Sequence, residues 1–221
     1  MSARDEVLGR IGKALGRATP SVLPTLDDQP VEVSAHLGAA QRSTLPATDM
    51  DTMGLLIRNM ESVLMSVDRV PATSECESAV TRYLEDQGID GTQPGTVTVS
   101  PALSGLAWPS GYGIGSASGA EQVGITPCIA AVAETGSIVT VSSSQTPASL
   151  NFLPETHIVV VQESQVVRYV EDVFAQLRAE APMPRAVNFI TGPSRTADIE
   201  QTLEIGAHGP RRVHVLLVAS R

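Results

Sequence analysis

The sequence predicts an α/β protein with three layers, in which helices cover both faces of a mostly parallel β-sheet. The run HIVVV at His157–Val161 has the continuous β-branched character of a strand that is buried on both faces. Segments with helical spacing alternate with such runs through the second half of the chain, which is typical of parallel sheets wound with helices. With 42% hydrophobic but only 3% aromatic residues, the core is expected to be aliphatic.

The N-terminal part of the chain is predicted to be an arm outside this core. The apolar positions Val7, Leu8, Ile11 and Leu15 have the spacing of a short amphipathic helix. A polar, proline-rich stretch without periodicity follows them. Because an isolated helix of this length is marginal in water, we expect it to dock on the body or on another subunit. The sequence therefore divides into a helix-and-linker arm over 1–50 and an α/β domain over 51–221.

The α/β domain is predicted to open with a helix over 53–64, where the apolar residues share one face. A short extended piece at Arg69–Ala72 follows. Ser74 and Glu77 have the capping-box spacing of a second helix, which Gly88 would end in the left-handed conformation. A strand at Thr96–Val99 then completes a strand-helix-strand unit. Such units place their strands parallel in one sheet.

The middle of the domain, 104–127, is rich in glycine and is predicted to be a loop. GYGIGSASG lacks the spacing and the following helix of a dinucleotide-binding motif. The only tryptophan, Trp108, can cover a ligand or pack against the body. After this loop, the apolar run Ile129–Val141 is broken by Glu134-Thr135-Gly136, which indicates a bend between paired strands or a bulge within one strand. Glu134 lies either at a solvent-facing tip or on a rigid turn that presents its carboxylate.

The C-terminal half is predicted to continue as strand, helix, strand, helix and strand in one parallel sheet. The three strands are the run at 157–161, Val187–Ile190 and Val213–Val218, and the first helix spans 166–177. The second helix is expected to start after Thr196. Ligands of such sheets bind beyond the carboxyl ends of the strands, and the segment after Ile190 lies at one of these ends.

That segment, TGPSRTADIEQTLEIGAHGP, reads as a junction between a strand and a helix. Gly192-Pro193 stops the strand, Ser194 and Thr196 can cap the helix, and Asp198 suits its positive end. Together with Arg195, the free N–H groups of a helix start can bind an anion. The simpler alternative is a well-capped helix with a solvated arginine.

Charge and cysteine content narrow the possible functions. A formal charge of −9 argues against general affinity for nucleic acid or anionic membranes, so any anion site must be local. Two cysteines are too few for an iron–sulfur cluster or a structural zinc, and the four histidines lack metal-ligand spacing. His157 and His214 each open an apolar run and are interpreted as structural. Without a signal-like segment or a stretch long enough to span a bilayer, we expect a cytoplasmic protein with free thiols.

Three motifs in this chain resemble those of one family. VAETGSIV, ITGPSRTADIE and AHGPRRVHVLLV, together with LNFLPETHIVVV, are similar to the lactate-utilisation protein C (LutC) family, which has a LUD domain, over about Asp51–Arg221. The resemblance implies the fold shared by sugar-phosphate isomerases and coenzyme A transferases (the NagB/RpiA/CoA transferase-like fold). It also implies a role in oxidising L-lactate to pyruvate with partner proteins that hold the iron–sulfur clusters. This chain is expected to bind no cofactor of its own.

The motifs of the family map onto named residues of this sequence. We expect Glu134 as the catalytic candidate, no metal ligands, and ligand-binding residues at Thr135, Gly136, Gly192, Pro193, Ser194, Arg195, Thr196, Asp198 and His208. The leading hypothesis is a subunit of a lactate-oxidising system that binds a small anion. The alternatives are an independent enzyme of the isomerase or coenzyme A transferase type, with Glu134 as nucleophile or base, and a scaffold subunit without a site.

Overall fold

The computed structural model describes most of the chain. The described residues are Val7, Arg10, Lys13 and Leu45 and the ranges 50–179, 183–197 and 203–219. The chain divides into two compact units, Met1–Thr44 and Leu45–Arg221. In the first unit Val7, Arg10 and Lys13 are helical and exposed, and the other residues of the predicted arm helix lie outside the described part. The second unit contains all the elements that follow.

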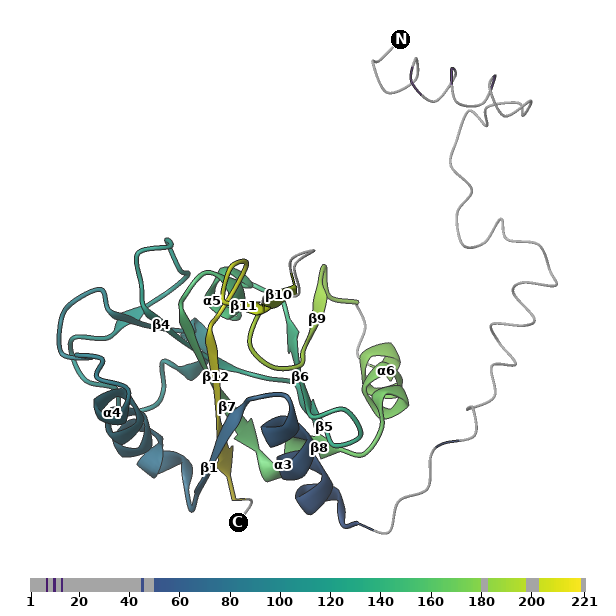
Figure 1. Cartoon of the computed structure of the whole chain (residues 1–221), viewed down its shortest axis with the longest axis horizontal. Coiled ribbons are helices and arrows are strands. Elements are labelled where there is room, and N and C mark those ends of the chain that lie inside the picture. The colour runs from purple at the N-terminus through teal and green to yellow at the C-terminus, as the bar shows by residue number, and fades with distance from the viewer. Residues whose placement is uncertain are drawn as a thin grey trace. The chain divides into compact units, whose positions relative to one another are not determined.

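The centre of the second unit is a six-stranded sheet (Figure 1). Its strands, in order across the sheet, are β1 (Ser66–Val70), β12 (Arg212–Val218), β7 (Thr156–Gln162), β4 (Val123–Pro127), β2 (Val97–Val99) and β3 (Gly113–Ile114). Every pair of neighbouring strands in it is parallel. The last of the described strands in the sequence, β12, thus lies between β1 and the rest of the sheet.

A smaller second sheet packs beside the central one. Its order is β8 (Val166–Val167), β5 (Ala130–Val132), β6 (Ser137–Val141) and β9 (Val187–Ile190). β6 is antiparallel to both β5 and β9, whereas β5 and β8 are parallel. A separate antiparallel pair is formed by β10 (Arg195–Ala197) and β11 (Leu203–Ile205).

Helices cover these sheets in layers. They are α3 (Thr52–Ser62), α4 (Cys76–Asp86), α5 (Ser149–Phe152) and α6 (Val170–Ala179), with 3-10 turns at Thr73–Glu75, Pro101–Leu103 and Glu163–Gln165. One face of the central sheet packs on α4, and the other packs on α3 and part of the second sheet. α6 packs on the second sheet through Val173 and Leu177. This arrangement confirms the predicted three-layer α/β fold with a mostly parallel sheet.

The alternation of side chains in β12 shows how the sequence builds these layers. Val213, Val215 and Leu217 belong to the core on the α3 side, whereas Leu216 and Val218 belong to the core on the α4 side. Both sets are buried because successive side chains of a strand point to opposite faces. Full burial of a Val or Leu side chain contributes about 1.5–3 kcal/mol, so a continuous apolar run favours a strand covered on both sides.

Helix α3 ends in a tight connection to β1. Asp51 caps its start by accepting a hydrogen bond from Gly54 N–H at 2.8 Å. After the helix, Leu64 adopts a positive φ of 67°, the only non-glycine residue among those described to do so. The connection places exposed Leu64 next to the amino end of β1, where a cavity lies.

Several sequence-based predictions for the first half are confirmed. β1, α4 and β2 form a strand-helix-strand unit within the parallel sheet, and Gly88 follows α4 with a φ of 67°. Trp108 is half-buried, donates its indole N–H to the Leu103 carbonyl at 2.8 Å and stacks on Tyr112. Trp108 therefore packs against the body.

The helix expected over 166–177 begins at Val170, after strand β8 at Val166–Val167. Two further predictions for the C-terminal half are wrong. β9 does not join the parallel sheet but pairs antiparallel with β6. Of the helix expected after Thr196, residues 198–202 lie outside the described part, and Leu203–Ile205 form a strand, β11, that pairs antiparallel with β10. In both cases pairing with another segment decides the structure. β9 pairs with the free edge of β6, and Arg195–Ala197 pairs with Leu203–Ile205. Asp198 lies outside the described residues.

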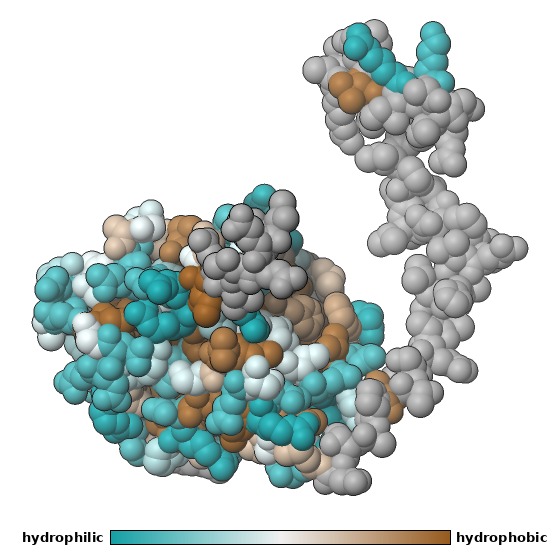
Figure 2. Space-filling view, viewed as in Figure 1, coloured by the Kyte–Doolittle hydropathy of each residue, from teal (hydrophilic) through white to brown (hydrophobic). Residues whose placement is uncertain are grey.

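The face of the second unit that Figure 2 shows is mostly polar. The face in Figure 2 shows hydrophilic residues with small hydrophobic areas between them. In the part of the chain that is described, no helix is long and apolar enough to cross a membrane.

Candidate functional site

Two of the motif segments meet at one end of the second sheet. β5 and β9 both run antiparallel to β6, so both end where β6 begins. A chain of hydroxyl groups joins the two segments there. Thr135 Oγ1 lies 2.7 Å from Ser137 Oγ, which lies 2.7 Å from Thr191 Oγ1. The structure thus brings the β5–β6 turn and the loop after β9 together.

Two glycines pack this end of the sheet against α3. Gly136 and Gly192 have φ values of 66° and 92°, in the left-handed region that other residues rarely adopt. A Cβ on Gly136 would lie 2.6 Å from the carbonyl carbon of Asn59. A Cβ on Gly192 would collide with the carbonyl oxygen of Val63. Both glycines are therefore needed for close contact with the helix backbone.

The Glu134 carboxylate points to the start of α6. Its Oε2 accepts a hydrogen bond from the N–H of Val170, the first residue of α6, at 3.4 Å. The backbone N–H of Glu134 donates to the Arg168 carbonyl at 3.0 Å. The Asn59 side chain donates to the carbonyls of Ala133 and Glu134 at 2.8 and 3.0 Å. Glu134 is thus half-buried in a rigid hairpin turn, with its carboxylate at a helix N-terminus that favours negative charge.

The loop after β9 is joined to the loop that holds the AHGP motif. Ser194 N–H donates to the Pro210 carbonyl at 2.9 Å, and Gly206 N–H donates to the Ser194 carbonyl at 2.8 Å. A Cβ on Gly209 would lie 3.3 Å from the Ser194 Cβ. The Ser194 N–H, which the predicted helix start would offer to an anion, therefore connects two loops instead.

The remaining predicted ligand residues lie around this pair of loops. Arg195 and His208 are exposed and Thr196 is half-buried. The Nη2 atom of Arg195 lies 3.4 Å from the position that a Cβ on Gly192 would take. Of the predicted ligand residues, Pro193 lines the cavity described next.

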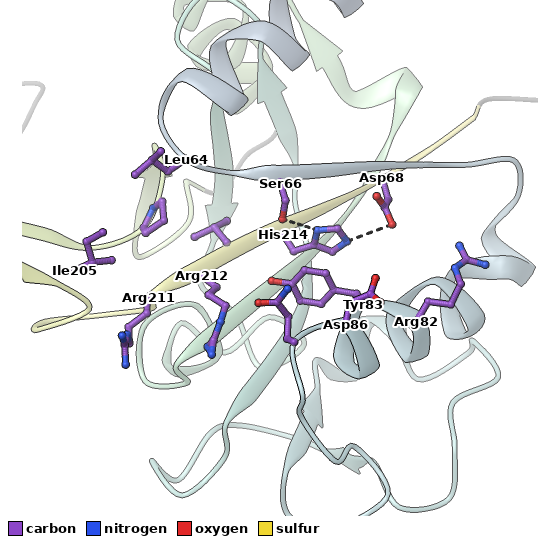
Figure 3. A pocket seen from close by; sticks show the side chains of 13 residues that line it. Leu64, Ser66, Asp68, Arg82, Tyr83, Asp86, Ile205, Arg211, Arg212 and His214 are labelled. Atoms are coloured by element: carbon purple, nitrogen blue, oxygen red, sulfur yellow. Dashed lines mark hydrogen bonds and ion pairs between the residues drawn. The ribbon is translucent and has the colours of Figure 1, made fainter.

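A cavity of about 400 Å³ lies beside the amino ends of β1 and β12 (Figure 3). Its walls come from the α3–β1 connection, β1, α4, β12 and the loops around the β10–β11 hairpin. They are formed by Leu64, Ser66, Asp68, Arg82, Tyr83, Asp86, Gln87, Pro193, Ile205, Arg211, Arg212, Val213 and His214. The volume lies in the range of small-molecule sites. The cavity is at the opposite ends of the strands from those that the sequence analysis expected to bind ligands.

His214 is the central polar group of this cavity. It is 1% exposed, and its Nδ1 lies 2.8 Å from Ser66 Oγ. Its ring stacks on Tyr83 with centroids 3.8 Å apart and an interplanar angle of 12°. Its Nε2 has no hydrogen-bond partner among the described residues and lies 3.9 Å from Asp68 Oδ2. Figure 3 shows the ring between the Ser66 and Asp68 side chains.

Burial controls the protonation of this cluster. Desolvation lowers the pKa of His214 to about 4, although the nearby Asp68 carboxylate acts in the opposite direction. Desolvation also raises the pKa of Tyr83, while a hydrogen bond with Ser66 and the charge of Arg212 partly offset the rise. The imidazole is therefore neutral at physiological pH, with one ring nitrogen as donor and the other as acceptor.

Arginines bring positive charge to the cavity. Arg212 Nη1 lies 3.3 Å from Glu155 Oε1 and 3.2 Å from Thr156 Oγ1, and Arg211 Nη1 lies 3.5 Å from the same Glu155 oxygen. These contacts use only one nitrogen of each guanidinium, which carries five N–H donors. With Arg82 on α4, the lining has three arginines against Asp68 and Asp86. A small carboxylate or phosphate is the class of ligand that this charge balance favours.

A second cavity of about 490 Å³ has the opposite character. It lies between α4 and the loop around Tyr112 and is lined by three acidic residues, Glu77, Glu85 and Asp90, and by no basic side chain. A negative lining disfavours anions. Within the described residues, no group of three His, Cys, Asp or Glu side chains could hold a metal ion.

Sequence reasoning missed the residues around His214. The histidine is buried in its strand, as expected, but it also lines the cavity. Its neighbours come from separate elements, and Ser66 is 148 residues away from it in the sequence. One local signal was present, because Ser66 and Asp68 are two residues apart in β1 and so point to the same face. Nothing in the sequence placed that face beside β12.

Comparison with known proteins gives one family and a set of relatives. The family profile described as the LUD domain matches residues 53–218. Proteins named "Lactate utilization protein C" from Geobacillus thermodenitrificans and Bacillus subtilis are each 38% identical over 120 residues. These matches cover 52% of this chain and 50% of each relative, so they span about half the length of both. The "Uncharacterized protein YkgG" of Escherichia coli is 28% identical over 236 residues and is covered to 99%, as is this chain.

A solved structure has a similar fold. The crystal structure of a DUF162 family protein from Deinococcus radiodurans superposes with a TM-score of 0.58. The match covers 78% of this chain and 99% of that protein at 22% sequence identity. At this identity the likeness concerns the fold alone.

Proposed function

Because the chain belongs to the LUD domain family, we propose that it is a cytoplasmic subunit of a lactate-utilisation system that oxidises L-lactate to pyruvate. In this proposal the chain binds the small anionic ligand, and iron–sulfur partner proteins take up the electrons. Its relatives named lactate utilization protein C support the biological role.

The observation that carries the proposal is the cavity beside His214. It combines arginines at its lining with a neutral, buried imidazole. A monocarboxylate can form charge-assisted hydrogen bonds with Arg212 or Arg211, which are stronger than bonds between neutral groups. A ligand of a few atoms is small enough for a space of about 400 Å³.

The assignment of electron uptake to partner proteins follows from the chemistry of the reaction. Oxidation of lactate to pyruvate releases two electrons and two protons, so an electron acceptor is required. Cys76 and Cys128 are the only cysteines of the sequence, fewer than the four that usually hold an iron–sulfur cluster. Both are buried, and burial raises the pKa of Cys128 to about 12, which disfavours the thiolate that binds metals. We therefore assign electron acceptance to the partners.

The proposal gives the family-motif residues a supporting part. Gly136 and Gly192 hold their turns against α3, and Pro193 extends from the second of these turns into the cavity wall. Glu134 does not line the cavity, and its carboxylate accepts a hydrogen bond at the start of α6. A catalytic role for Glu134, on which the isomerase or transferase alternative depends, stays a prediction.

Deleting the gene from its native cell tests the biological role. We expect loss of growth on L-lactate, normal growth on pyruvate, and recovery when the intact gene is returned. Purification of the returned protein in tagged form should yield iron–sulfur proteins with it. Normal growth of the deletion strain on lactate would overturn the proposal.

The binding part of the proposal is tested with the purified chain. Arg212→Gln should weaken L-lactate binding about tenfold, because it removes a charge-assisted bond of roughly 1.5–3 kcal/mol. Arg69→Gln is the matched control, since Arg69 forms a similar exposed ion pair, with Glu163 at 2.9 Å, outside the cavity. Equal affinity of both variants would exclude Arg212 from the ligand site.

A further inference from the structure

We propose that the cavity selects hydroxy acids over oxo acids, because the ligand hydroxyl group bridges His214 Nε2 and Asp68 Oδ2. This inference rests on the proposed function for the identity of the ligand, and it adds the group that the site recognises. It assigns His214 and Asp68 to ligand binding.

The distance between the two atoms fits a bridging oxygen. His214 Nε2 and Asp68 Oδ2 are 3.9 Å apart, which is too long for a direct hydrogen bond. An oxygen atom can lie about 2.8 Å from both atoms, because the sum of two such distances exceeds the separation between the atoms. Nε2 is buried, belongs to a residue that lines the cavity, and lacks a hydrogen-bond partner among the described residues. A buried polar atom without a partner is destabilising, so an oxygen placed there satisfies it.

The tautomer of His214 decides which oxygen is preferred. An ionised Asp68 only accepts hydrogen bonds, so it favours the tautomer with a proton on Nε2. Ser66 Oγ then donates to Nδ1 at 2.8 Å. A bridging oxygen must accept from Nε2–H and donate to the Asp68 carboxylate. A hydroxyl group does both, whereas the oxo group of pyruvate can only accept and would face a negative carboxylate.

The ring is held in position for this role. Tyr83 stacks on one side of it, and Ser66 fixes its in-plane orientation. Arg212 lies two residues before His214 in β12 and on the same face, about 6.6 Å along the strand. An arginine side chain is long enough to reach the carboxylate of a ligand whose hydroxyl group lies beside His214. The other charged groups of the lining are Arg82, Asp86 and Arg211.

Calorimetric titration of the purified full chain with three small acids tests the inference. L-lactate has a hydroxyl group, pyruvate has an oxo group, and propionate has neither. We expect lactate to bind about tenfold more tightly than propionate, and pyruvate to bind no more tightly than propionate. Equal affinities for the three acids would overturn the inference, as would the absence of lactate binding at millimolar concentration.

Asp68→Asn tests the role of the carboxylate. Its amide can donate a hydrogen bond to an oxo group, so the ratio of lactate to pyruvate affinity should fall about tenfold. Asp86→Asn is the matched control, because Asp86 is the other carboxylate of the lining, and it should leave the ratio unchanged. A thermal midpoint near that of wild type shows that each variant is folded. An unchanged ratio in folded Asp68→Asn would contradict the bridge.

His214→Phe provides a second variant at the same position. Phenylalanine keeps the stack on Tyr83 but lacks both ring nitrogens, so the preference for lactate over propionate should disappear. If preference persists, His214 does not recognise the hydroxyl group.

Growth and binding separate the two proposals. A deletion strain that grows on lactate refutes the proposed function even if the hydroxyl preference is measured, whereas lost growth with equal affinities refutes the inference alone.

Discussion

His157 and His214 have similar immediate partners in different surroundings. They are 0% and 1% exposed in neighbouring strands of the central sheet. One ring nitrogen of each contacts a hydroxyl group, Thr126 Oγ1 at 2.7 Å for His157 and Ser66 Oγ at 2.8 Å for His214. The other nitrogen of each ring has no hydrogen-bond partner among the described residues.

The surroundings separate the two histidines. Val159, two residues after His157 in β7, belongs to the core on the α3 side. Leu216, two residues after His214 in β12, belongs to the core on the α4 side. The two rings therefore lie on opposite faces of the sheet. Of the two, only His214 lines one of the two cavities described above, and it faces a carboxylate. An unpartnered buried nitrogen thus indicates a ligand site only where there is space and a second polar group beside it.

Acid should produce the largest effect, and both histidines should contribute to it. Burial lowers the pKa of His157 to about 3 and of His214 to about 4 from 6.5. As pH falls from 6.5, the unfolded chain binds protons that the folded chain does not, so the free energy of unfolding decreases. Above pH 6.5 this contribution is fully present. At pH 4 each histidine should have removed about 3 kcal/mol.

Urea unfolding at a series of pH values measures this loss. His157→Gln and His214→Gln should each reduce the slope of stability against pH between pH 4 and 6.5, because glutamine does not titrate. Slopes equal to that of wild type in both variants would show that the two rings are not held neutral.

Removal of the hydroxyl partner of His157 should have a smaller effect. Thr126→Val keeps the shape of the side chain but leaves a second ring nitrogen without a partner in the core, at a cost of about 1–3 kcal/mol. Urea unfolding at neutral pH measures the loss, and lactate binding should not change. A weaker affinity for lactate would show that the surroundings of His157 are not independent of the cavity at His214.

The equivalent change beside His214 should have the smallest effect on stability. Ser66 is exposed, so water can replace its hydroxyl group, and Ser66→Ala should change the free energy of unfolding by about 0.5 kcal/mol or less. Loss of the bond that orients the ring should weaken lactate binding about fivefold, or ~1 kcal/mol. If binding is unchanged while stability drops by more than this, Ser66 has a structural role alone.

Local sequence patterns predicted most of the elements but not all of their partners. The apolar run at His157–Val161, the helix over 53–64 and the bend at Glu134–Gly136 each have a signal within a few residues. The position of β9 depends on β6, which lies more than 40 residues earlier and antiparallel to it. Periodicity identifies a strand without identifying its neighbour, so β9 was assigned to the wrong sheet.

The candidate site was predicted in part for the same reason. The sequence indicated the loop that carries Pro193, because glycine, proline and a neighbouring arginine form a local motif. The grouping of Ser66, Tyr83 and His214 comes from three elements that only the folded sheet brings together. A single histidine in an apolar strand gave no sign of which side chains would surround it.

The position of β12 also has a consequence for biosynthesis. β1 is an edge strand whose only neighbour in the sheet is β12, and the paired residues Ser66 and His214 are 148 residues apart. At about 5–20 residues per second, a ribosome needs roughly 7–30 s to make the intervening chain. During that time β1 has no partner, and its charged residues Asp68 and Arg69 help to protect it from pairing with other chains. The cavity around His214 can form only when β12 has been made, so in a nascent chain the proposed ligand site is completed in the same step as the central sheet.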